Sequence, residues 1–309
     1  MSRERTISLG PHSATPALSV LTPFYRYDTS DMLARMANAP TGVEFVLLDD
    51  GSGDAALLAR VVEAATALNA PVRIIVRERN QGRAAARNRL VAEARGAYVL
   101  FLDADMAPDR PTFLTHWLSV TRCQQPDVAF GGLSLRHVAR TRETALHHNL
   151  FGASDCRSAE HRQISPAQST ASANLLVRRA FLAAHPFDAS FSGWGFEDTD
   201  WALTAAQHTA ILHVDNPATH IGLDSAATLL RKSTEAGPNF ARLAAKHPRA
   251  VRTFAAHRAA QLIKRAPLRK KMAQACAWIA KDELGAAPMP IRRAALKFFR
   301  AAQYAEHLA

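Results

Sequence analysis

The chain has 309 residues, of which 48% are hydrophobic and 21% charged, a balance typical of a globular protein and not of a disordered one. Its three cysteines, Cys123, Cys156 and Cys276, are too scattered for a zinc site or a disulfide framework. Residues 1–16 are polar and lack the apolar core of a signal peptide, and no apolar run approaches the roughly 20 residues that span a bilayer. We therefore expect a cytoplasmic protein, either soluble or attached peripherally to the inner face of the membrane.

The formal net charge of +11 is concentrated near the C-terminus. Residues 225–309 hold 17 Lys and Arg residues against four acids, a net charge of +13, and residues 1–224 carry the remaining −2. Such an uneven distribution indicates an anionic partner for the C-terminal segment. A membrane surface, a nucleic acid and an acidic polymer are the open alternatives.

Short apolar runs alternate with helix-like segments through the first two-thirds of the chain. The runs are continuous, rich in β-branched or aromatic residues and bounded by turn formers, which predicts buried strands at 18–21, 45–48, 72–76 and 98–102. Segments rich in Ala, Leu and Arg predict helices at 54–68 and 83–94. This alternation predicts an α/β fold, a mostly parallel sheet with helices on both faces and functional loops beyond the carboxyl ends of its strands.

The rest of the chain predicts strands at 127–135, 173–177 and 211–214 and a helix at 199–208. Residues 136–172 are polar and too numerous for a simple connector, which predicts a functional loop or a small subdomain. Helices broken near Gly237, Pro267 and Pro288 are predicted from residue 225 onward. We therefore divide the chain into a flexible N-terminus (1–16), an α/β domain (17–224) and a basic helical extension (225–309).

Two of the predicted strands end in paired acids. Asp49 and Asp50 follow the strand at 45–48, where a helix N-cap would explain Ser52 but not both carboxylates. Asp103 and Asp105 follow the strand at 98–102. Two carboxylates one residue apart suit Mn²⁺ or Mg²⁺, which take oxygen ligands and can share them with phosphate groups. A solvated turn is the alternative for Asp103 and Asp105, and their position downstream of Asp49 and Asp50 favours a metal site.

Between these acids, Gly82 lets the chain turn into a helix on which Arg83 and Arg87 share one face. Guanidinium groups beside a helix start suit an anionic diphosphate, and a solvated basic face is the alternative.

A further group of acids follows a glycine-rich segment around Trp194. Glu197, Asp198 and Asp200 stand at a predicted helix start, where the helix dipole favours acids. Three acids between two tryptophans exceed what capping requires. Tryptophan faces stack on sugar rings, and a carboxylate beside them can accept a proton from an acceptor.

These four elements, in this order and at these spacings, resemble the family 2 glycosyltransferases of GT-A fold over residues 17–223. Residues 193–200, Gly-Trp-Gly-Phe-Glu-Asp-Thr-Asp, also resemble the Trp-Gly-Gly-Glu-Asp region of β-1,4-galactosyltransferases and chondroitin polymerases. The resemblance implies a Rossmann-like nucleotide-diphospho-sugar transferase fold and a Mn²⁺ or Mg²⁺ cofactor. It also implies inverting transfer of a sugar, with UDP-sugars favoured, to a saccharide or lipid-linked acceptor, as in bacterial surface polysaccharide or lipopolysaccharide synthesis.

The resemblance also implies roles for individual residues. Asp198 would be the catalytic base, and Glu197 and Trp194 would bind the acceptor. Asp103 and Asp105 would form the metal-binding motif, with Asp105 as the direct ligand and His220 completing the shell. The nucleotide would be bound by Thr22, Pro23, Phe24, Asp50, Arg87 and Asp103, with Phe24 against the base and Asp50 on a ring N–H.

Three positions bear on how closely the resemblance applies. Phe196 stands where the galactosyltransferases have glycine, which predicts different acceptor contacts. Tyr25 stands where many family members have asparagine, which bears on base recognition. His213 is the alternative to His220 as a metal ligand.

Two other functions compete with this interpretation. A sugar-1-phosphate nucleotidyltransferase is expected to carry a glycine-rich phosphate loop after its first strand, whereas residues 21–26 contain no glycine. A nucleic-acid-binding protein would use the basic C-terminal segment, which has no recognisable reader motif and would leave the paired acids without a function. We therefore expect no nucleic acid partner. A non-catalytic sugar-binding protein is disfavoured because Asp105 and Asp198 are both present.

Overall fold

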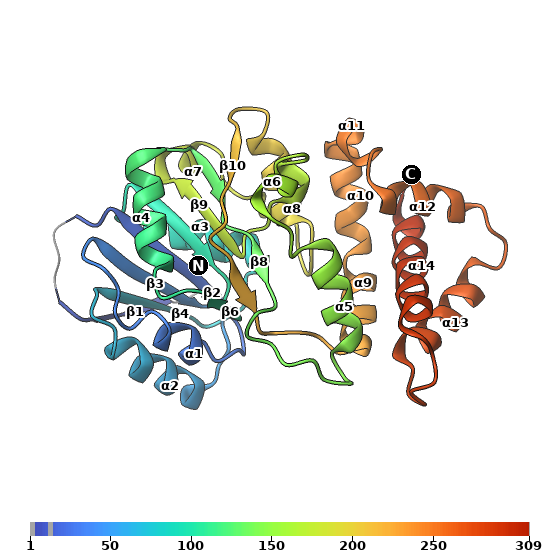
Figure 1. Ribbon diagram of the computed structural model, residues 1–309, viewed down its shortest axis with the longest axis horizontal. Helices are drawn as coiled ribbons and strands as arrows, with labels where there is room; N and C mark the ends of the chain where they lie inside the picture. The colour runs from blue at the N-terminus through green and yellow to red at the C-terminus, as the bar shows by residue number, and fades with distance from the viewer. Residues whose placement is uncertain (1–3, 12–14, 309) are drawn as a thin grey trace.

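The computed structural model describes residues 4–11 and 15–308, and an eight-stranded sheet lies at its centre (Figure 1). In spatial order its strands are β1 (Glu4–Leu9), β4 (Val72–Arg77), β3 (Val43–Asp49), β2 (Leu18–Phe24), β5 (Tyr98–Leu102), β9 (Asn174–Arg178), β7 (Val128–Phe130) and β10 (Ile211–His213). Strands β4, β3, β2 and β5 are parallel, whereas β1 and β9 run antiparallel to their neighbours. The predicted mostly parallel sheet is confirmed.

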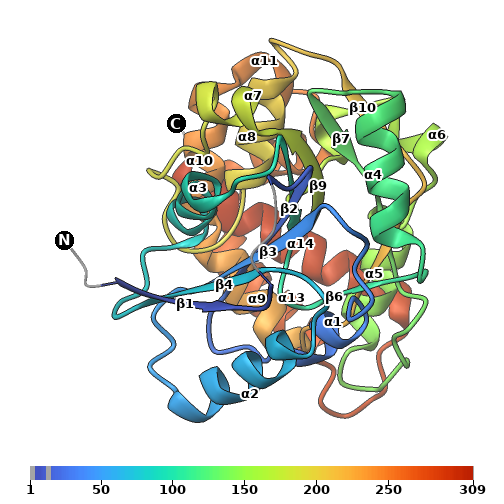
Figure 2. The ribbon, with the colours of Figure 1, turned by 90° about the vertical axis from the view of Figure 1, so that its left-hand side faces the viewer.

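Helices cover both faces of this sheet, which is why its central strands are apolar along their whole length. Figure 2 shows α3 (Arg83–Glu93) and α7 (Arg179–Ala184) on one side of the strands, and α1 (Ser30–Ala34), α2 (Ala55–Thr66) and α4 (Phe113–Cys123) on the other. Leu57 of α2, Leu90 of α3 and Trp117 of α4 belong to the same hydrophobic core as the strands. Every residue of β3 and β5 is buried.

Two of the predicted strands differ from those in the structure. Strand β2 continues to Phe24 instead of ending at Leu21, because β3 pairs with it as far as Phe24 although the pairing with β5 ends at Leu21. The strand predicted at 127–135 is divided, since Gly132 has a φ of +88° and turns the chain after β7. The second part, β8 (Leu133–Ser134), joins β6 (Met106–Pro108) and β11 (Ala218–His220) in a small three-stranded sheet.

The predicted flexible N-terminus is also corrected. Residues 4–9 form the edge strand β1, in register with the whole of β4, while residues 1–3 and 12–14 lie outside the described residues. Glu4 makes ion pairs with Arg77 and Arg89, at 2.8 Å each. These pairs fix the edge strand to β4 and to helix α3.

The prediction of helices from residue 225 onward is confirmed. They are α9 (Ala226–Glu235), α10 (Gly237–Lys246), α11 (Pro248–Val251), α12 (Ala255–Lys264), α13 (Arg269–Lys281) and α14 (Met289–His307). Two apolar clusters join this region to the rest, one around Phe240 and Tyr304 and one between α9, α14 and α5 (Ala145–Ser154). Within the described residues, no helix has both the length and the apolar character to cross a bilayer.

Candidate functional site

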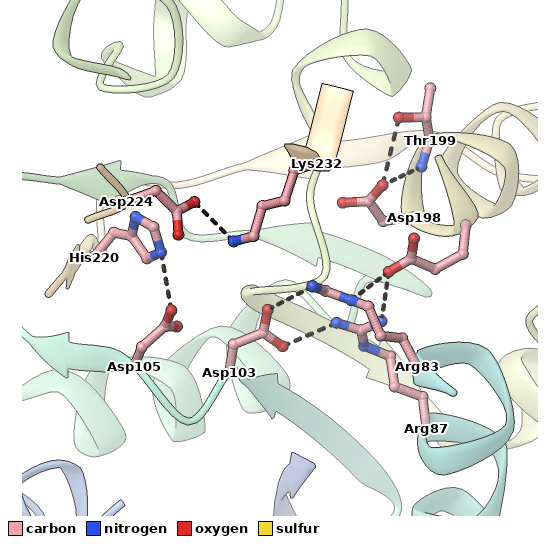
Figure 3. A network of polar contacts seen from close by, with 10 residues as sticks. Arg83, Arg87, Asp103, Asp105, Asp198, Thr199, His220, Asp224 and Lys232 are labelled. Atoms are coloured by element: carbon pink, nitrogen blue, oxygen red, sulfur yellow. Dashed lines mark hydrogen bonds and ion pairs between the residues drawn. The ribbon is translucent and has the colours of Figure 1, made fainter. Parts of the chain in front are cut away.

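The acidic residues singled out in the sequence come together at one edge of the sheet (Figure 3). Asp103 and Asp105 follow β5, because a buried apolar strand delivers them beyond its carboxyl end. Glu197 and Asp198 open α8 (Glu197–Ala205), and His220 ends β11. Segments more than 100 residues apart in the sequence therefore supply one cluster of titratable groups.

Two arginines of α3 bind this cluster together. Arg87 donates to Asp103 Oδ1 at 2.9 Å and to Glu197 Oε1 at 3.0 Å, and its side chain is 1% exposed. Arg83 pairs with the same two carboxylates, at 3.2 Å and 2.7 Å, but its side chain is 42% exposed. Burial opposes ionisation of Asp103 and Glu197, yet the two guanidinium charges outweigh it and lower the pKa of both carboxyl groups.

This arrangement bears on two sequence predictions. Arg87 is enclosed between Asp103 and Glu197, whereas Arg83 is the arginine that faces the open side of the cluster. Both oxygens of Asp103 accept hydrogen bonds from arginines. The predicted contact of Arg87 with the nucleotide, and the predicted contacts of Asp103 with the metal and the nucleotide, stay predictions.

Asp50 lies behind the start of α3. The residue is 4% exposed. Its carboxylate accepts a hydrogen bond from Arg77 at 3.0 Å and from the backbone N–H groups of Gln81 and Gly82 at 3.0–3.2 Å. Gly82 has a φ of +88°, which an L-residue rarely adopts, and it begins the helix that carries both arginines. Asp50 thus holds the turn that positions Arg83, and its predicted contact with a base stays a prediction.

Other residues predicted to hold the nucleotide are buried in the core. Phe24 is 3% exposed and belongs to the main hydrophobic cluster, and Thr22 is fully buried with its hydroxyl 3.8 Å from Met32 Sδ. Strand β2 is longer than predicted, so these side chains still lie within the sheet, and their predicted contact with the nucleotide stays a prediction. Tyr25, 43% exposed, is the first aromatic side chain beyond it, and Pro23 is half-buried.

Asp105 and His220 form the part of the cluster that fits a divalent cation. Asp105 Oδ2 and His220 Nε2 lie 3.0 Å apart, with both side chains partly exposed. Two ligands at about 2.1 Å from one metal and at right angles to each other would be separated by about 3 Å. His220 Nδ1 is buried and has no hydrogen-bond partner among the described residues, so the ring has no competing polar contact. The donor pair therefore fits Mn²⁺ or Mg²⁺.

No third protein ligand stands near enough to complete such a site within residues 4–11 and 15–308. The alternative ligand His213 lies elsewhere, where its Nδ1 accepts from Arg162 at 3.1 Å and its Nε2 is 3.2 Å from the carbonyl oxygen of Pro166. His213 is therefore structural. Burial opposes protonation of His220, but the hydrogen bond and the charge of Asp105 outweigh it and raise the pKa of His220.

Gly222 encloses Asp105 from the other side. A Cβ at this position would lie 2.5 Å from Asp105 Oδ2 and 2.9 Å from its Cβ, so a side chain cannot be accommodated without moving the carboxylate. The neighbouring Ile221 N–H donates to the carbonyl oxygen of Asp105 at 2.9 Å. The segment after β11 therefore fixes Asp105 by backbone contacts.

Asp198 has the environment of a general base. Its Oδ1 accepts from the backbone N–H of Thr199 at 2.8 Å, and within the described parts of the chain Oδ2 makes no hydrogen bond. Burial, with the nearby charge of Glu197, raises the pKa of Asp198 to about 6. A carboxylate with a pKa this close to neutrality is both ionised at pH 7 and basic enough to take a proton.

The loop before Asp198 is held in an unusual backbone conformation. Phe196 has a φ of 71°, a rare value for a bulky residue, and it follows Gly195 with a φ of 92°. The Phe196 ring packs on Phe240 of α10 and on Tyr304 of α14, with ring centroids 5.2 Å and 5.7 Å apart. Asn239 Nδ2 donates to the carbonyl oxygens of Ser192 and Gly195, which fixes the same loop from α10. Helices of the C-terminal region therefore hold the loop of the predicted base.

Residues that the sequence analysis did not single out surround Trp194. Lys232 of α9 lies with its Nζ 5.4 Å from the Trp194 ring and pairs with Asp224 at 2.7 Å, and the Asp224 N–H donates to His147 Nδ1. His147 belongs to the polar stretch expected to be functional, whereas Lys232 carries no local sequence signal. In Figure 3, Lys232 projects toward the space between Asp224 and Asp198.

A polar cavity of about 330 Å³ lies beside the end of β7 and residues 154–171. Its lining includes Asp155, Arg157, Ser165 and Thr170, together with Ala171. Two residues after Ala171, the carbonyl oxygen of Ala173 accepts from the N–H of Asp103 at 3.3 Å. The cavity and Asp103 thus share the segment that leads into β9.

Known proteins match both the sequence and the fold. Residues 19–164 match the sequence model of glycosyl transferase family 2. An uncharacterized glycosyltransferase of Haemophilus influenzae is 31% identical over 93 residues, which are 29% of this chain and 36% of that protein's length. The matched segment thus spans about a third of the curated relative.

Solved structures resemble the whole chain at low identity. A mannosyltransferase from Pyrobaculum calidifontis, in complex with GDP-Man and Mn²⁺, has a TM-score of 0.59 at 17% identity and covers 94% of this chain and 86% of its own. S. aureus TarS 1-349 has a TM-score of 0.53 at 17% identity, with 93% and 90% covered. Glucosyl-3-phosphoglycerate synthase from Mycobacterium tuberculosis, with Mn²⁺, UDP and glucosyl-3-phosphoglycerate, has a TM-score of 0.51 at 17% identity, with 75% and 80% covered. Residues 19–164 are thus similar to the family 2 glycosyltransferases, and the chain has the GT-A fold that these solved structures share.

Proposed function

We propose that this protein is a metal-dependent, inverting glycosyltransferase that moves a sugar from a nucleoside-diphosphate donor to an acceptor hydroxyl. The observation that carries the proposal is the convergence of Asp198, the Asp105–His220 pair and Arg83 at one edge of the sheet. A base, two cation ligands and an exposed guanidinium are the groups that such a transfer requires.

The protein residues divide the reaction between them. The acceptor oxygen attacks the anomeric carbon while its proton passes to Asp198 Oδ2, the bond from that carbon to the diphosphate oxygen breaks, and the nucleoside diphosphate leaves. A single displacement with one carboxylate base gives inversion at the anomeric carbon. Arg83 is positioned to pair with the phosphate groups, because it is the exposed member of the arginine pair.

Asp105 and His220 would hold Mn²⁺ or Mg²⁺. When bound, the cation supplies Lewis-acid stabilisation of negative charge on the diphosphate. Since the described residues offer two ligands and no third, oxygens of the donor and water would fill the other positions. The metal-containing complexes of the P. calidifontis and M. tuberculosis proteins support this assignment.

The acceptor would lie on the side of Asp198 that Trp194 and Lys232 flank. Glu197 is bonded to both arginines, so it orients the cluster, and Trp194 supplies a face for a sugar ring. We favour a UDP-sugar donor and a saccharide or lipid-linked acceptor of bacterial surface polysaccharide or lipopolysaccharide synthesis.

The proposal is tested by incubating the protein with UDP-, GDP-, CMP- and dTDP-sugars, with and without Mn²⁺. We expect one donor class to raise the melting temperature in the presence of Mn²⁺ and to be hydrolysed slowly. Asp105→Asn is expected to abolish the metal-dependent part of that stabilisation. If no nucleotide-sugar stabilises or is consumed by the wild-type protein, the proposed donor chemistry is wrong.

A further inference from the structure

The exposed apolar side chains of this protein are gathered in one region. Of the eight large hydrophobic side chains that are exposed in the described residues, six lie between residues 262 and 291. They are Leu262 (82%), Leu268 (58%), Met272 (46%), Trp278 (64%), Leu284 (80%) and Ile291 (51%). Figure 1 shows α12 and α13 on the side of α14 that faces away from the sheet. These side chains therefore lie far from the acid cluster, and the transfer chemistry does not account for them.

The same region carries uncompensated positive charge. Residues 255–281 contain seven Lys and Arg residues and no Asp or Glu. Lys270 lies 3.8 Å from Glu306 of α14, whereas Lys271 and Lys281 have no carboxylate within 4.0 Å in the part of the chain that the structure describes. In contrast, Arg83 and Arg87 each pair with both Asp103 and Glu197. The cations of α12 and α13 thus remain available to an external partner.

The charged and apolar groups share one face of α13. Ala273 and Ala280 are buried where the helix packs on α14, since small side chains allow close approach. Trp278 points away from that contact. Lys271 precedes Trp278 by seven residues and Lys281 follows it by three, so both lysines lie on the same helical face as the tryptophan. Leu268 precedes the first turn of the helix and is exposed. A tryptophan flanked by lysines on an outward helix face is typical of a helix that lies in a membrane interface.

We propose that the α12–α13 surface, residues 255–281, binds the surface of an anionic lipid bilayer. Trp278, Leu262 and Leu268 enter the boundary between headgroups and acyl chains, and Lys271 and Lys281 pair with lipid phosphates. Charge complementarity selects this occupant, because residues 255–281 carry seven cations and no acid of their own, and such a surface attracts anionic headgroups. A nucleic acid would use the lysines but would leave the exposed leucines in water. The proposal does not depend on the transferase chemistry.

The test is vesicle flotation of the full chain. We expect binding to vesicles of phosphatidylcholine with phosphatidylglycerol, much weaker binding to phosphatidylcholine alone, and release at high salt. Lys271→Gln with Lys281→Gln is expected to lower the partition coefficient about 30-fold, since two surface lysines are lost. Leu262→Ser with Trp278→Ser is expected to lower it about tenfold or more, because the inserted apolar side chains are lost.

Matched variants outside the surface serve as controls. Arg35→Gln with Arg122→Gln removes two exposed cations elsewhere, and Ile164→Ser removes an apolar side chain that is 76% exposed. Both are expected to bind vesicles as the wild type does. The proposal is overturned if the wild type stays unbound, or if the controls lose as much binding as the α13 variants. If the Leu262→Ser with Trp278→Ser variant binds as the wild type does and DNA displaces the protein from the vesicles, the surface binds nucleic acid, and the membrane proposal is equally overturned.

Discussion

The acid cluster and the α12–α13 surface both carry several charged side chains, and they differ in whether those charges are paired within the protein. In the cluster, Asp103 and Glu197 are each bonded to both Arg83 and Arg87, within 3.2 Å. On the α12–α13 surface, Lys271 and Lys281 have no acidic partner among the described residues. Charges that are paired inside the protein hold reactive groups in place, whereas unpaired charges at the surface await an external partner. Mutations should therefore separate the two regions cleanly.

The largest effect is expected for Asp198→Asn. An amide cannot take the proton of the acceptor, so turnover should fall about 10²–10⁴-fold while nucleotide and metal binding persist. Steady-state kinetics alongside calorimetric titration of the donor would measure both quantities. Asp215→Asn, at a carboxylate 63% exposed and away from the cluster, is the matched control and should keep full turnover. Near-normal turnover of Asp198→Asn would remove this residue from the role of base.

The next largest effect is expected on stability. Arg87→Ala leaves two buried carboxylates short of a cation, which typically costs about 3–5 kcal/mol of unfolding free energy. Arg83→Ala removes a partner of the same carboxylates from a half-exposed position, which should cost less than about 1 kcal/mol. Denaturant unfolding of both variants measures the difference. Equal losses would show that Arg87 does not hold the cluster together.

Gly222→Ala should affect metal binding more than folding. The added Cβ would meet Asp105 Oδ2 at 2.5 Å, so the carboxylate must move away from His220. Disturbing the support of a metal ligand typically weakens metal binding about 10–100-fold. Titration of Mn²⁺ by electron paramagnetic resonance would measure it, with Gly152→Ala as the control, since its Cβ would meet only the flexible end of Leu135 at 3.3 Å. Unchanged Mn²⁺ affinity in the Gly222 variant would separate this glycine from the metal site.

The sequence predicts the sheet and the acid cluster because both are marked by local patterns. Each apolar run and the acids that follow it, Asp49 with Asp50 and Asp103 with Asp105, can be recognised within a few consecutive residues of the sequence. The burial of Thr22 and Phe24 depends instead on how far β2 stays paired with β3, and strand pairing is a long-range property. Likewise, Lys232 reaches Trp194 only because α9 packs against the rest of the molecule, and nothing around residue 232 indicates it. Residues at strand ends are thus predictable, and residues brought in by tertiary packing are not.

The pH dependence should belong to the cluster alone. Burial and the charge of Glu197 raise the pKa of Asp198 to about 6, so the base is ionised above that pH and protonated below it. We expect kcat/KM to fall about tenfold per pH unit on the acid side, with the midpoint at or below about 6, since a bound cation favours the ionised form. Asp198→Asn should lose this acid limb. An unchanged limb in the variant would assign it to another group.

The smallest effect is expected when the α12–α13 surface is altered and the chemistry is measured in solution. Lys271→Gln with Lys281→Gln should leave hydrolysis of the donor unchanged and shift the free energy of unfolding by no more than about 0.5 kcal/mol, because neither lysine has an acidic partner in the described structure. Asp198→Asn should in turn bind anionic vesicles as the wild type does. A loss of donor hydrolysis in the double lysine variant would mean that the surface and the acid cluster are coupled through α14, which contacts α13 on one side and the aromatic residues behind Phe196 on the other. Independence of the two measurements would show that unpaired surface charge and paired interior charge serve separate functions in this chain.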